Sequence, residues 1–422
     1  MRFLFLTQYF PPEIGGPQTR LRSVAQHLLE AGHEVEVVTS LPNYPRGKFF
    51  AGYEHRFYMR ETLQGVPVHR VWLYPALGGG FGRILNYLSF TLTCIFGLLR
   101  SHRPDFLFVE SPPLTLSIPA WLFSRIWRIP FVFNVADLWP DAIVDTGFLK
   151  DGLALRVLRA LENFSYRSAA SVTAVTAGIR QSLLSKGVAA SKVSYLPNGA
   201  DTAQFRPAAP DLELKRRLGL DGKRVILWAG TLGFAHGLQF VLQAAKRLTG
   251  SPEIHFLFVG DGSAKSELQQ LAADLALSNA TFLDPVQLDE LPAYFSIAEC
   301  GLASLKRAPT HEGARPSKIF PVLASGKPLI FVGSGECARL IQEADAGIVV
   351  PPEEPEMLAA AIQEFFANQT RVVACGRNGR RFVEKYFAWP VLIEAWLASL
   401  AHHAPASLAL PGPERVAPRY PS

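Results

Sequence analysis

The sequence alternates short apolar segments with amphipathic helical segments, and it does so twice along the chain. In the first half, strands are expected at 3–10, 35–38, 106–109, 131–135, 171–175 and 193–196, with helices such as 21–29 and 154–164 between them. In the second half, strands are expected at 225–229, 256–259, 281–283, 300–304, 329–332 and 348–350, and helices at 237–248, 264–275, 288–297, 336–343 and 356–367. Strand–helix–strand units build parallel, doubly wound sheets. The pattern therefore predicts an α/β protein with two consecutive β/α sandwiches.

Two domains also agree with the length of 422 residues, which is long for one compact domain. The loop 198–210 is rich in Pro, Ala and Asp and is interpreted as the linker. We expect a first domain at 1–203 and a second at 204–385. A helix at 386–400 is expected to pack back on the first domain, and 401–422 is expected to be a disordered tail.

Composition excludes several classes of protein. Hydrophobic residues make up 49% and charged residues 18%, which excludes a disordered chain. Four cysteines without a CxxC pair predict neither a disulfide framework nor a zinc site and favour a reducing compartment. No secretory signal is expected at the N-terminus. The apolar run 84–99 would reach about 24 Å as a helix, short of the roughly 30 Å hydrocarbon core, so a membrane span is not expected.

The positive charge is confined to the first half. Residues 1–203 contain 20 Lys and Arg against 14 Asp and Glu, whereas residues 204–422 contain 22 of each. A basic half indicates an anionic partner, such as acidic lipid, phosphate esters or nucleic acid, or serves solubility alone.

Glycines follow the first expected strand. In a parallel sheet, ligands bind beyond the carboxyl ends of the strands. Gly15 and Gly16 would let backbone N–H groups approach a phosphate at a helix start, although a tight turn also explains them.

The segment Arg315-Pro316-Ser317-Lys318 precedes another helix. Cations at a helix N-terminus oppose the helix dipole, so Arg315, Ser317 and Lys318 favour a bound anion there. The alternative is a solvated loop.

Two further glycine-containing loops follow strands of the second series. One carries Gly230, Thr231, Gly233 and His236, and the other carries Gly260, Asp261 and Gly262. Each alone is typical of a turn. Together they predict a nucleotide-binding face on the second sheet.

Asp137 follows the strand 131–135. A carboxylate at a strand end is a candidate general base for a hydroxyl group, or it caps a helix.

Taken in order, these segments resemble a known family. FLTQYFPPEIGGPQTRL (5–21), DLWP (137–140), PNGADTAQF (197–205), GDG (260–262) and RPSKIF…ASGKP (315–328) are similar to those of retaining nucleotide-sugar glycosyltransferases of family 4, over residues 1 to about 400. The resemblance is strongest to the subgroup that builds O-antigen or capsule, which includes N-acetylfucosaminyltransferases. It implies the GT-B architecture, in which two Rossmann-like domains face a central cleft.

The resemblance also implies roles for single residues. The donor would be held mainly by the second domain, with Lys318 on the diphosphate and Gly16 close to the phosphates and sugar. The acceptor would be held by Arg20, Asp137 and Trp139, with Asp137 and Lys318 as the catalytic pair. The interdomain end of the cleft would be closed by Asn198, Gly199 and Asp201.

Three departures from the family pattern bear on donor binding. Many relatives carry Arg and Lys where this chain has Thr231 and His236, so Arg315 and Lys318 would have to balance more of the diphosphate charge. Pro321 replaces the glutamate expected to hold the ribose, and Gly313 stands where the other glutamate would be, with Glu312 one position away.

The implied reaction is a same-face displacement in which the leaving diphosphate assists deprotonation of the acceptor. The resemblance also implies that neither a cofactor nor a metal is needed, because Lys, Arg and helix dipoles replace a metal in such sites; no DxD motif or His/Cys cluster in the sequence argues otherwise. UDP is the commonest nucleotide in the subgroup.

Two segments of the first half suit a lipid surface. Residues 46–60 interleave five basic residues (Arg46, Lys48, His55, Arg56, Arg60) with five aromatic ones (Phe49, Phe50, Tyr53, Phe57, Tyr58). The apolar run 84–99 lies between Arg83 and Arg100, and 121–128 adds Trp127. We interpret them as a docking surface for an anionic membrane that carries a polyprenyl-diphosphate-linked acceptor. The alternatives are a buried core helix at 84–99 and single-stranded nucleic acid at 46–60, the latter without an RNA-binding motif.

The sequence therefore predicts a cytoplasmic glycosyltransferase, peripheral on the inner face of the membrane, that makes surface polysaccharide. The same enzyme with a soluble acceptor, and a non-catalytic protein that binds a nucleotide sugar or a lipid carrier, are the alternatives.

Overall fold

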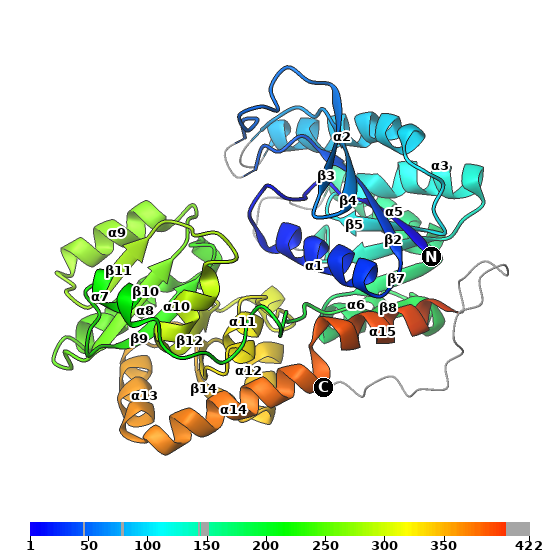
Figure 1. Ribbon diagram of the computed structural model, residues 1–422. Helices are drawn as coiled ribbons and strands as arrows, with labels where there is room; N and C mark the ends of the chain where they lie inside the picture. The colour runs from blue at the N-terminus through cyan, green and yellow to red at the C-terminus, as the bar shows by residue number, and fades with distance from the viewer. Residues whose placement is uncertain (45–46, 77–79, 142–143, 145–151, 402–422) are drawn as a thin grey trace. The chain divides into compact units, whose positions relative to one another are not determined.

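The structure is a computed structural model that describes residues 1–401 except 45–46, 77–79, 142–143 and 145–151. It divides into two compact units, one made of residues 1–197 with a helix near the C-terminus, the other of residues 198–388. The boundary follows Pro197 rather than residue 203, so the loop expected as a linker, 198–210, belongs to the second unit. Figure 1 colours both units by residue number. The expected tail lies outside the described residues, apart from residue 401.

Unit 1 is built on an eight-stranded sheet of order β3-β4-β2-β1-β5-β6-β7-β8 among its described residues. The strands are β1 (Arg2–Leu6), β2 (Glu34–Ser40), β3 (Tyr58–Leu63), β4 (Val66–Val71), β5 (Phe106–Ser111), β6 (Phe131–Val135), β7 (Ser171–Ala174) and β8 (Val193–Tyr195). All neighbouring pairs are parallel except β3 and β4. The central strands are apolar and buried because helices cover both faces of the sheet.

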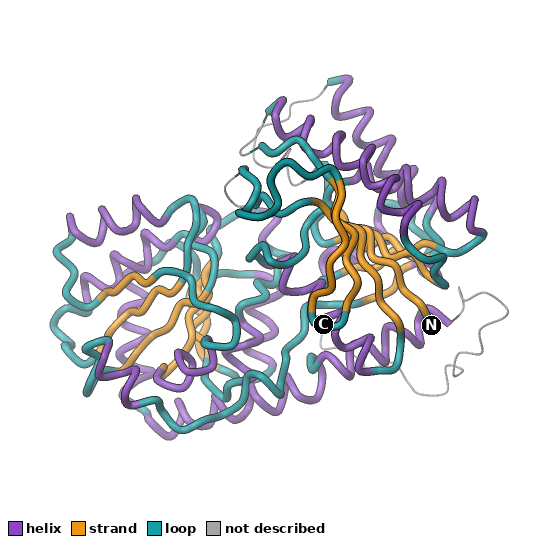
Figure 2. Tube along the Cα trace, turned by 45° about the horizontal axis from the view of Figure 1, so that its top comes forward, coloured by secondary structure: helices purple, strands orange, loops and turns teal. Residues whose placement is uncertain are grey.

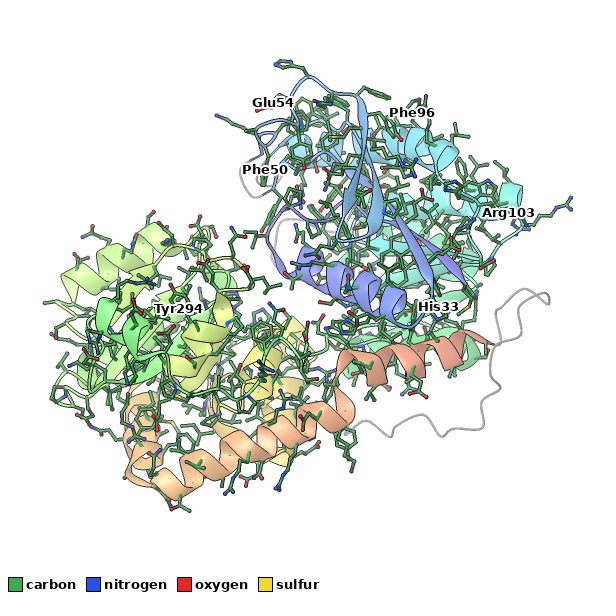
Figure 3. All side chains as sticks on the ribbon, in the orientation of Figure 1. His33, Phe50, Glu54, Phe96, Arg103 and Tyr294 are labelled. Carbon is green, nitrogen blue, oxygen red and sulfur yellow. The ribbon has the colours of Figure 1, made fainter. Side chains whose placement is uncertain are left out.

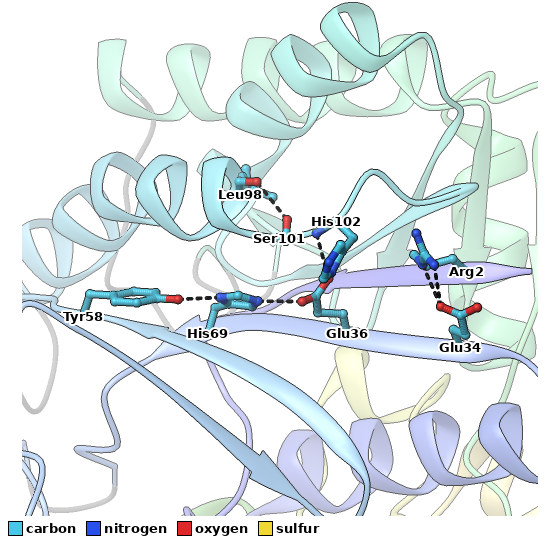
Figure 4. A network of polar contacts seen from close by, with 8 residues as sticks. All are labelled: Arg2, Glu34, Glu36, Tyr58, His69, Leu98, Ser101 and His102. Atoms are coloured by element: carbon cyan, nitrogen blue, oxygen red, sulfur yellow. Dashed lines mark hydrogen bonds and ion pairs between the residues drawn. The ribbon is translucent and has the colours of Figure 1, made fainter.

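The antiparallel hairpin β3–β4 was not expected from the sequence. His69 of β4 joins it to β2, because its Nε2 donates to Glu36 Oε1 at 2.7 Å while Tyr58 donates its hydroxyl proton to His69 Nδ1 at 2.8 Å (Figure 4). The backbone N–H of His102 donates to the other oxygen of Glu36 at 2.9 Å. Burial would raise the pKa of Glu36, but these hydrogen bonds hold it below its usual value. These hydrogen bonds thus fix the hairpin to β2.

Helices lie on both faces of the unit 1 sheet (Figure 2). They are α1 (Gly16–Glu30), α2 (Phe81–Arg100), α3 (Ser117–Trp127), α5 (Leu153–Ser168), α6 (Ala177–Ser185) and α15 (Trp389–Leu400), with 3₁₀ turns η1 (Leu114–Leu116) and η2 (Ala190–Lys192). One core gathers Phe90 of α2 and Phe123 of α3 against β1 and β5. On the other face, Trp396 of α15 packs against Phe3 and Phe108. The C-terminal helix therefore completes the first unit.

Unit 2 has a six-stranded, fully parallel sheet of order β11-β10-β9-β12-β13-β14. Its strands are β9 (Arg224–Ala229), β10 (Ile254–Val259), β11 (Ala280–Leu283), β12 (Ala298–Ser304), β13 (Leu329–Val332) and β14 (Gly347–Val350). Its helices are α7 (Leu212–Arg217), α8 (Leu238–Arg247), α9 (Lys265–Asp274), α10 (Leu291–Ile297), α11 (Ile319–Ala324), α12 (Gly335–Glu343), α13 (Pro355–Ala367) and α14 (Gln369–Tyr386), with 3₁₀ turns η3 (Phe234–His236) and η4 (Pro309–His311).

The unit 2 sheet separates two apolar cores. Leu227 and Phe331 face α10, α11 and α12, whereas Trp228 and Phe256 face α8, α9 and α13. This doubly wound arrangement directs the loops after β9, β10 and β12 to one edge of the sheet, where a parallel sheet binds its ligands. The GT-B fold expected from the sequence is confirmed, since each unit carries its own parallel sheet with helices on both faces.

Candidate active site

The glycine loop after β1 is held by buried polar contacts. Glu13 accepts hydrogen bonds from the backbone N–H groups of Asn43 and Tyr44, at 2.7 and 2.8 Å, and thereby joins this loop to the loop after β2. Burial raises the pKa of Glu13, although these bonds oppose the rise. α1 begins at Gly16 with neither a side-chain cap nor an acidic residue in its first turn. Pro17 has no N–H group, and the N–H of Thr19 donates to Gly15 O at 3.0 Å, so the N–H groups of Gly16 and Gln18 are those left for an anion.

Arg20 lies in α1, directly behind this loop, and is buried. Its Nη2 donates to the carbonyl oxygen of Leu196 at 2.7 Å and to Asn134 Oδ1 at 3.4 Å. Its Nη1 lies 3.8 Å from Glu110 Oε2. Arg20 thus connects α1 to the carboxyl ends of β5, β6 and β8. Sequence reasoning missed Glu110, because nothing in its surroundings, Val109-Glu110-Ser111, marks a site.

Asp137 and Trp139 follow β6, as expected. Asp137 is exposed, whereas Trp139 is half-buried with its ring edge-on to Tyr87 at a centroid distance of 5.9 Å. A carboxylate and an aromatic ring two positions apart at one strand end are the kinds of group that bind the hydroxyl groups and the ring of a sugar.

A cationic and aromatic cluster extends from Trp139 to the start of α2. Arg83 donates from Nη2 to the Tyr9 hydroxyl at 2.7 Å, and its guanidinium lies 4.7 Å from the centroid of Tyr87. The sequence marked Arg83 only as the flank of an apolar run. Only the fold brings it next to Tyr9, which lies 74 positions earlier in the chain.

The exposed side of α2 and α3 is apolar, and we call it the α2–α3 apolar surface. It consists of Phe81, Ile84, Leu85, Leu88, Leu92, Leu99, Ile118, Trp121, Leu122 and Ile126. Basic residues border it, including Arg103 beyond α2 (Figure 3) and Arg125 and Arg128 at the end of α3. Within the described residues, only α2 is long and apolar enough to cross a membrane, and 39% of its most apolar 18-residue window is buried. One side of the helix expected at 84–99 is thus packed in the core of unit 1, and its other side is exposed to solvent.

The basic and aromatic segment 46–60 differs from the expectation in part. Tyr58 begins β3 and packs against Phe96 of α2, and Tyr53 donates its hydroxyl proton to Glu61 at 3.1 Å. These two rings therefore serve the fold rather than a lipid surface. Phe57 remains exposed, and Arg46 lies outside the described residues.

In unit 2, the two glycine loops pack backbone against backbone. Leu232 N–H donates to Asp261 O, and Ala264 N–H donates to Leu232 O, both at 2.9 Å. A Cβ on Gly260 would overlap the carbonyl oxygen of Gly230, and a Cβ on Gly262 would overlap that of Leu232. Gly260 and Gly262 are thus required for loop packing, whatever else binds there. Thr231 and Asp261 are exposed at this edge, beside Gly233.

Lys318 lies against the first of these loops. Its Nζ is 3.3 Å from the centroid of the buried Trp228 ring. It also lies next to Gly230, 3.9 Å from the point where a Cβ would lie if this residue had one. Burial lowers the pKa of Lys318 well below its usual value. The contacts found for this ammonium group in the described part of the chain are the Trp228 ring and His236, and neither is an anion.

His236 is the second partner of Lys318, with 3.4 Å between Nε2 and Nζ. Its Nδ1 lies 3.2 Å from Ser304 O, so this nitrogen carries the proton and Nε2 accepts from the ammonium group. Burial, reinforced by the charge of Lys318, lowers the pKa of His236 to about 3. The residue at the family's lysine position is therefore neutral, and a lysine from another segment lies beside it.

Arg315, expected to act with Lys318, lies in a different environment. Its guanidinium is buried, forms an ion pair with Glu336 at 2.9 Å and lies over the Phe387 ring at 4.9 Å. Its charge is compensated inside unit 2 because α12 begins with a carboxylate beside it. Ser317, between the two cations, is exposed.

The residues expected to close the cleft begin unit 2. Asn198 and Gly199 are half-buried, and Asp201 accepts from the N–H groups of Ala203 and Gln204, at 3.1 and 2.8 Å. Asp201 thus stabilises a turn, which is a sufficient reason for its presence.

Pro321 lies in α11. Its side chain has no hydrogen-bond acceptor and so cannot do what the glutamate expected at this position would do for the ribose. Glu312 is exposed nearby in the chain, and one of its oxygens accepts from the Ser334 hydroxyl. The described residues contain no group of three or more His, Cys, Asp or Glu that could hold a metal ion. All four cysteines are buried and free.

Two family models match the chain. Residues 15–199 match the family described as "Glycosyl transferase 4-like domain", and residues 223–368 match "Glycosyl transferases group 1". The two matches divide the chain as the two units do.

Curated relatives cover almost the whole chain. WcaI of Escherichia coli K12, whose name assigns it to colanic acid biosynthesis as a glycosyl transferase, is 29% identical over 376 residues, which are 86% of this chain and 92% of WcaI. A GDP-mannose-dependent α-mannosyltransferase of Mycolicibacterium smegmatis is 25% identical over 93% of this chain and 95% of its own.

Solved structures share the fold. Anabaena HepE, solved with UDP and glucose, superposes with a TM-score of 0.70 at 19% identity and covers 93% of this chain and 97% of its own. Sucrose-phosphate synthase of Thermosynechococcus elongatus gives 0.72 at 17% identity, with 93% and 96% covered.

Proposed function

The chain belongs to the family 4 glycosyltransferases of GT-B fold, and from this premise we propose that it is a retaining, metal-independent enzyme that moves a sugar from a UDP-linked donor to a polyprenyl-diphosphate-linked acceptor in surface polysaccharide synthesis. A hexosyl or N-acetylhexosaminyl group is the proposed cargo. The proposed location is the cytoplasmic face of the membrane, with the protein bound peripherally.

One observation carries the donor half of the proposal, namely the uncompensated charge of Lys318. A partly buried ammonium group without a carboxylate partner is costly unless an anion joins it. Here the described partners are a Trp228 ring and a neutral imidazole. A diphosphate would supply the missing negative charge. The exposed edge of the two glycine loops offers it room beside Lys318.

In the proposed reaction the bond between the sugar C1 and the diphosphate oxygen breaks, and a bond from C1 to the acceptor oxygen forms on the same face. The acceptor hydroxyl gives its proton to the leaving diphosphate. Lys318 stabilises the negative charge that develops on that group. Asp137 orients the acceptor hydroxyl. Lys318 supplies the positive charge that a metal ion would otherwise bring to the diphosphate, so the proposed reaction has no resident metal.

Unit 1 supports the acceptor half. A polyprenyl diphosphate combines a long apolar chain with a double negative charge. The α2–α3 apolar surface with its basic border matches such a lipid in an anionic membrane. Arg83 and Tyr87 near the start of α2, with Trp139 against Tyr87, are where we propose that a headgroup sugar is held. WcaI and the mannosyltransferase are named for glycan synthesis and glycosyl transfer, which fits a role in polysaccharide assembly.

The experiment that tests the proposal is mass spectrometry of lipid-linked saccharides after incubation with UDP-glucose, UDP-N-acetylglucosamine and GDP-mannose. We expect one donor to extend a polyprenyl-diphosphate-linked sugar and to release nucleoside diphosphate. Lys318→Ala should lower kcat about 10²- to 10³-fold, as expected for loss of a group that stabilises the leaving charge.

The matched control is Arg307→Ala, which removes an exposed cation of the same unit and should retain turnover. His236→Lys is not a suitable control, because it would add a cation next to Lys318. Binding of donor without release of diphosphate would instead favour a non-catalytic binding protein. Extension of a water-soluble acceptor at equal rate would remove the lipid-linked acceptor from the proposal.

A further inference from the structure

Glu110 lies at the carboxyl end of β5, a strand between β1 and β6 in unit 1. It is paired in register with Asn134 of β6, whose Nδ2 donates to Glu110 Oε2 at 2.7 Å. Arg20 approaches the same oxygen from α1, with Nη1 at 3.8 Å. Only 2% of Glu110 and 6% of Arg20 are exposed. Three buried polar side chains from a helix and two strands therefore meet behind the acceptor side of the unit.

The arrangement leaves polar atoms unmatched. Within the described residues, Glu110 Oε1 and the Nε and Nη1 atoms of Arg20 have no hydrogen-bond partner. Buried polar groups are ordinarily hydrogen-bonded, and an Arg–carboxylate pair commonly forms two parallel bonds. A pair that served stability alone could be replaced by apolar residues of similar volume. The incomplete hydrogen bonding of Arg20 and Glu110 is therefore better explained by a role in the candidate site than by a role in stabilising the core.

The same side chains border the residues expected to hold the acceptor. Asn134 lies three positions before Asp137, so the group that binds Glu110 also fixes the end of β6 from which Asp137 extends. Arg20 follows the Gly15–Gly16 loop in α1 and donates to Leu196 O, close to the end of the first chain segment of unit 1. Glu110 thus contacts Asn134, which precedes Asp137 in the chain, and Arg20, which follows the Gly15–Gly16 loop.

We propose that Glu110 is a positioning residue of the transfer reaction, which holds Arg20 and Asn134 so that Asp137 and the start of α1 keep their places around the hydroxyl group of a sugar acceptor. This inference rests on the proposed function. Because its carboxylate is buried, Glu110 does not touch the substrate and acts through its two partners.

The charge of Glu110 provides a readout that a purely structural role would not. The charged groups that face it are Arg20 from α1 and Asp137 after β6. Burial raises the pKa of Glu110 to about 7, against the opposing effects of Arg20 and Asn134, and Asp137 adds to the rise. The ionised carboxylate is the form that attracts Arg20, so kcat/KM for the acceptor should increase as the pH passes through about 7.

The test compares the steady-state kinetics of wild type, Glu110→Gln and Glu110→Asp, with the donor and acceptor pair that turns over in the saccharide assay. Glu110→Gln should raise the acceptor KM about tenfold, as expected for loss of one charged contact, and leave the donor KM within about twofold. It should also abolish the increase near pH 7, whereas Glu110→Asp should retain that increase.

Glu36→Gln is the matched control, because Glu36 is equally buried in the same sheet but belongs to the His69 network near the start of β2 (Figure 4). It should lower the melting temperature without changing either KM. An unchanged acceptor KM and pH profile in Glu110→Gln, or an equal change in Glu36→Gln, overturns the inference.

If Glu110→Gln does not fold, Asn134→Ser removes the group that holds Oε2 and must raise the acceptor KM; an unchanged value there overturns the inference as well. A folded wild-type protein that transfers no sugar from any donor overturns the proposed function, and with it the inference. Turnover by wild type with unaltered Glu110 variants overturns the inference alone.

Discussion

The two units have the same kind of sheet but treat buried cations differently. In unit 1, Arg20 lies beside Glu110 and Arg70 beside Glu61, so each buried guanidinium faces a carboxylate. In unit 2, Arg315 is likewise paired with Glu336, but Lys318 contacts only an aromatic ring and a neutral histidine among the described residues. A buried cation without a carboxylate partner is costly, and this cost is the reason for proposing that an anionic ligand binds at Lys318 and not at the compensated cations.

The outer surfaces also differ. Ten apolar side chains are exposed together on α2 and α3 of unit 1, whereas those described as exposed in unit 2, Leu212, Phe234, Met357 and Val373, are spread over four elements. Scattered apolar residues are ordinary for a protein surface, whereas many exposed apolar side chains on two neighbouring helices favour a binding surface. The proposed function relates this difference to an apolar acceptor at unit 1 and an anionic donor at unit 2.

The largest expected effect on stability comes from removing the carboxylate partner of Arg315, which leaves this cation without a carboxylate, as Lys318 is among the described residues. Glu336→Ala leaves a buried guanidinium without its carboxylate and should lower the free energy of unfolding by about 3–5 kcal/mol, measured by urea denaturation. Lys318→Ala should not lower it, because it removes a cation that has no carboxylate partner in the described part of the chain.

The control for this comparison is Glu384→Ala, which breaks the more exposed i,i+4 pair with Arg380. It should cost under about 1 kcal/mol. Equal losses in Glu336→Ala and Lys318→Ala would contradict the distinction between a compensated and an uncompensated cation.

The next effect concerns the outer surface. Leu92 and Leu99 are 70% and 69% exposed on α2, so replacing both with serine removes apolar area without opening the core. Binding to vesicles with anionic lipid, measured by sedimentation, should weaken about tenfold. The melting temperature should stay within about 1–2 °C of wild type, because surface substitutions rarely change stability by more than about 0.5 kcal/mol.

Leu212→Ser, at a leucine of unit 2 that is 62% exposed, is the matched control and should bind vesicles like the wild type. The docking surface would be rejected if wild type bound no vesicles at low or high salt, or if both variants lost binding equally.

The smallest expected effect tests the missing cation in the glycine loop. Thr231 is exposed at the edge where Lys318 lies, so Thr231→Arg can add a donor to the diphosphate without repacking the core. The donor KM should fall about three- to tenfold. Thr231→Gln, similar in length but uncharged, should give little improvement; an equal gain in both variants would mean that charge is not what limits donor binding.

Much of the fold could be predicted from the sequence, because a parallel sheet covered on both faces needs continuous apolar strands separated by amphipathic helices. The strands from β5 to β8 and from β9 to β14 lie where the apolar runs are. The hairpin β3–β4 escaped because its residues, such as Arg60, Glu61, His69 and Arg70, are polar and look like a surface segment. They are accommodated by ion pairs and by the His69 network, which depend on partners elsewhere in the sheet.

The site was predictable in outline only. Glycines and a lysine at strand ends and helix starts indicated Lys318 and the two loops, since backbone geometry limits which residues fit there. The difference between Arg315 and Lys318 could not be predicted, because two cations three residues apart look equivalent in the sequence until Glu336 is placed beside Arg315. Glu110 could not be found either, because its partner Arg20 lies far away in the chain.

The sequence by itself determined two doubly wound sheets, since the period of its apolar residues dictates which segments become strands and helices. It also determined the basic excess of the first half and the types of residue at the strand ends. Tertiary structure alone decided which charges are compensated and which apolar side chains remain exposed. The reason is that both depend on distances across the fold, and a pattern of neighbours along the chain does not contain those distances.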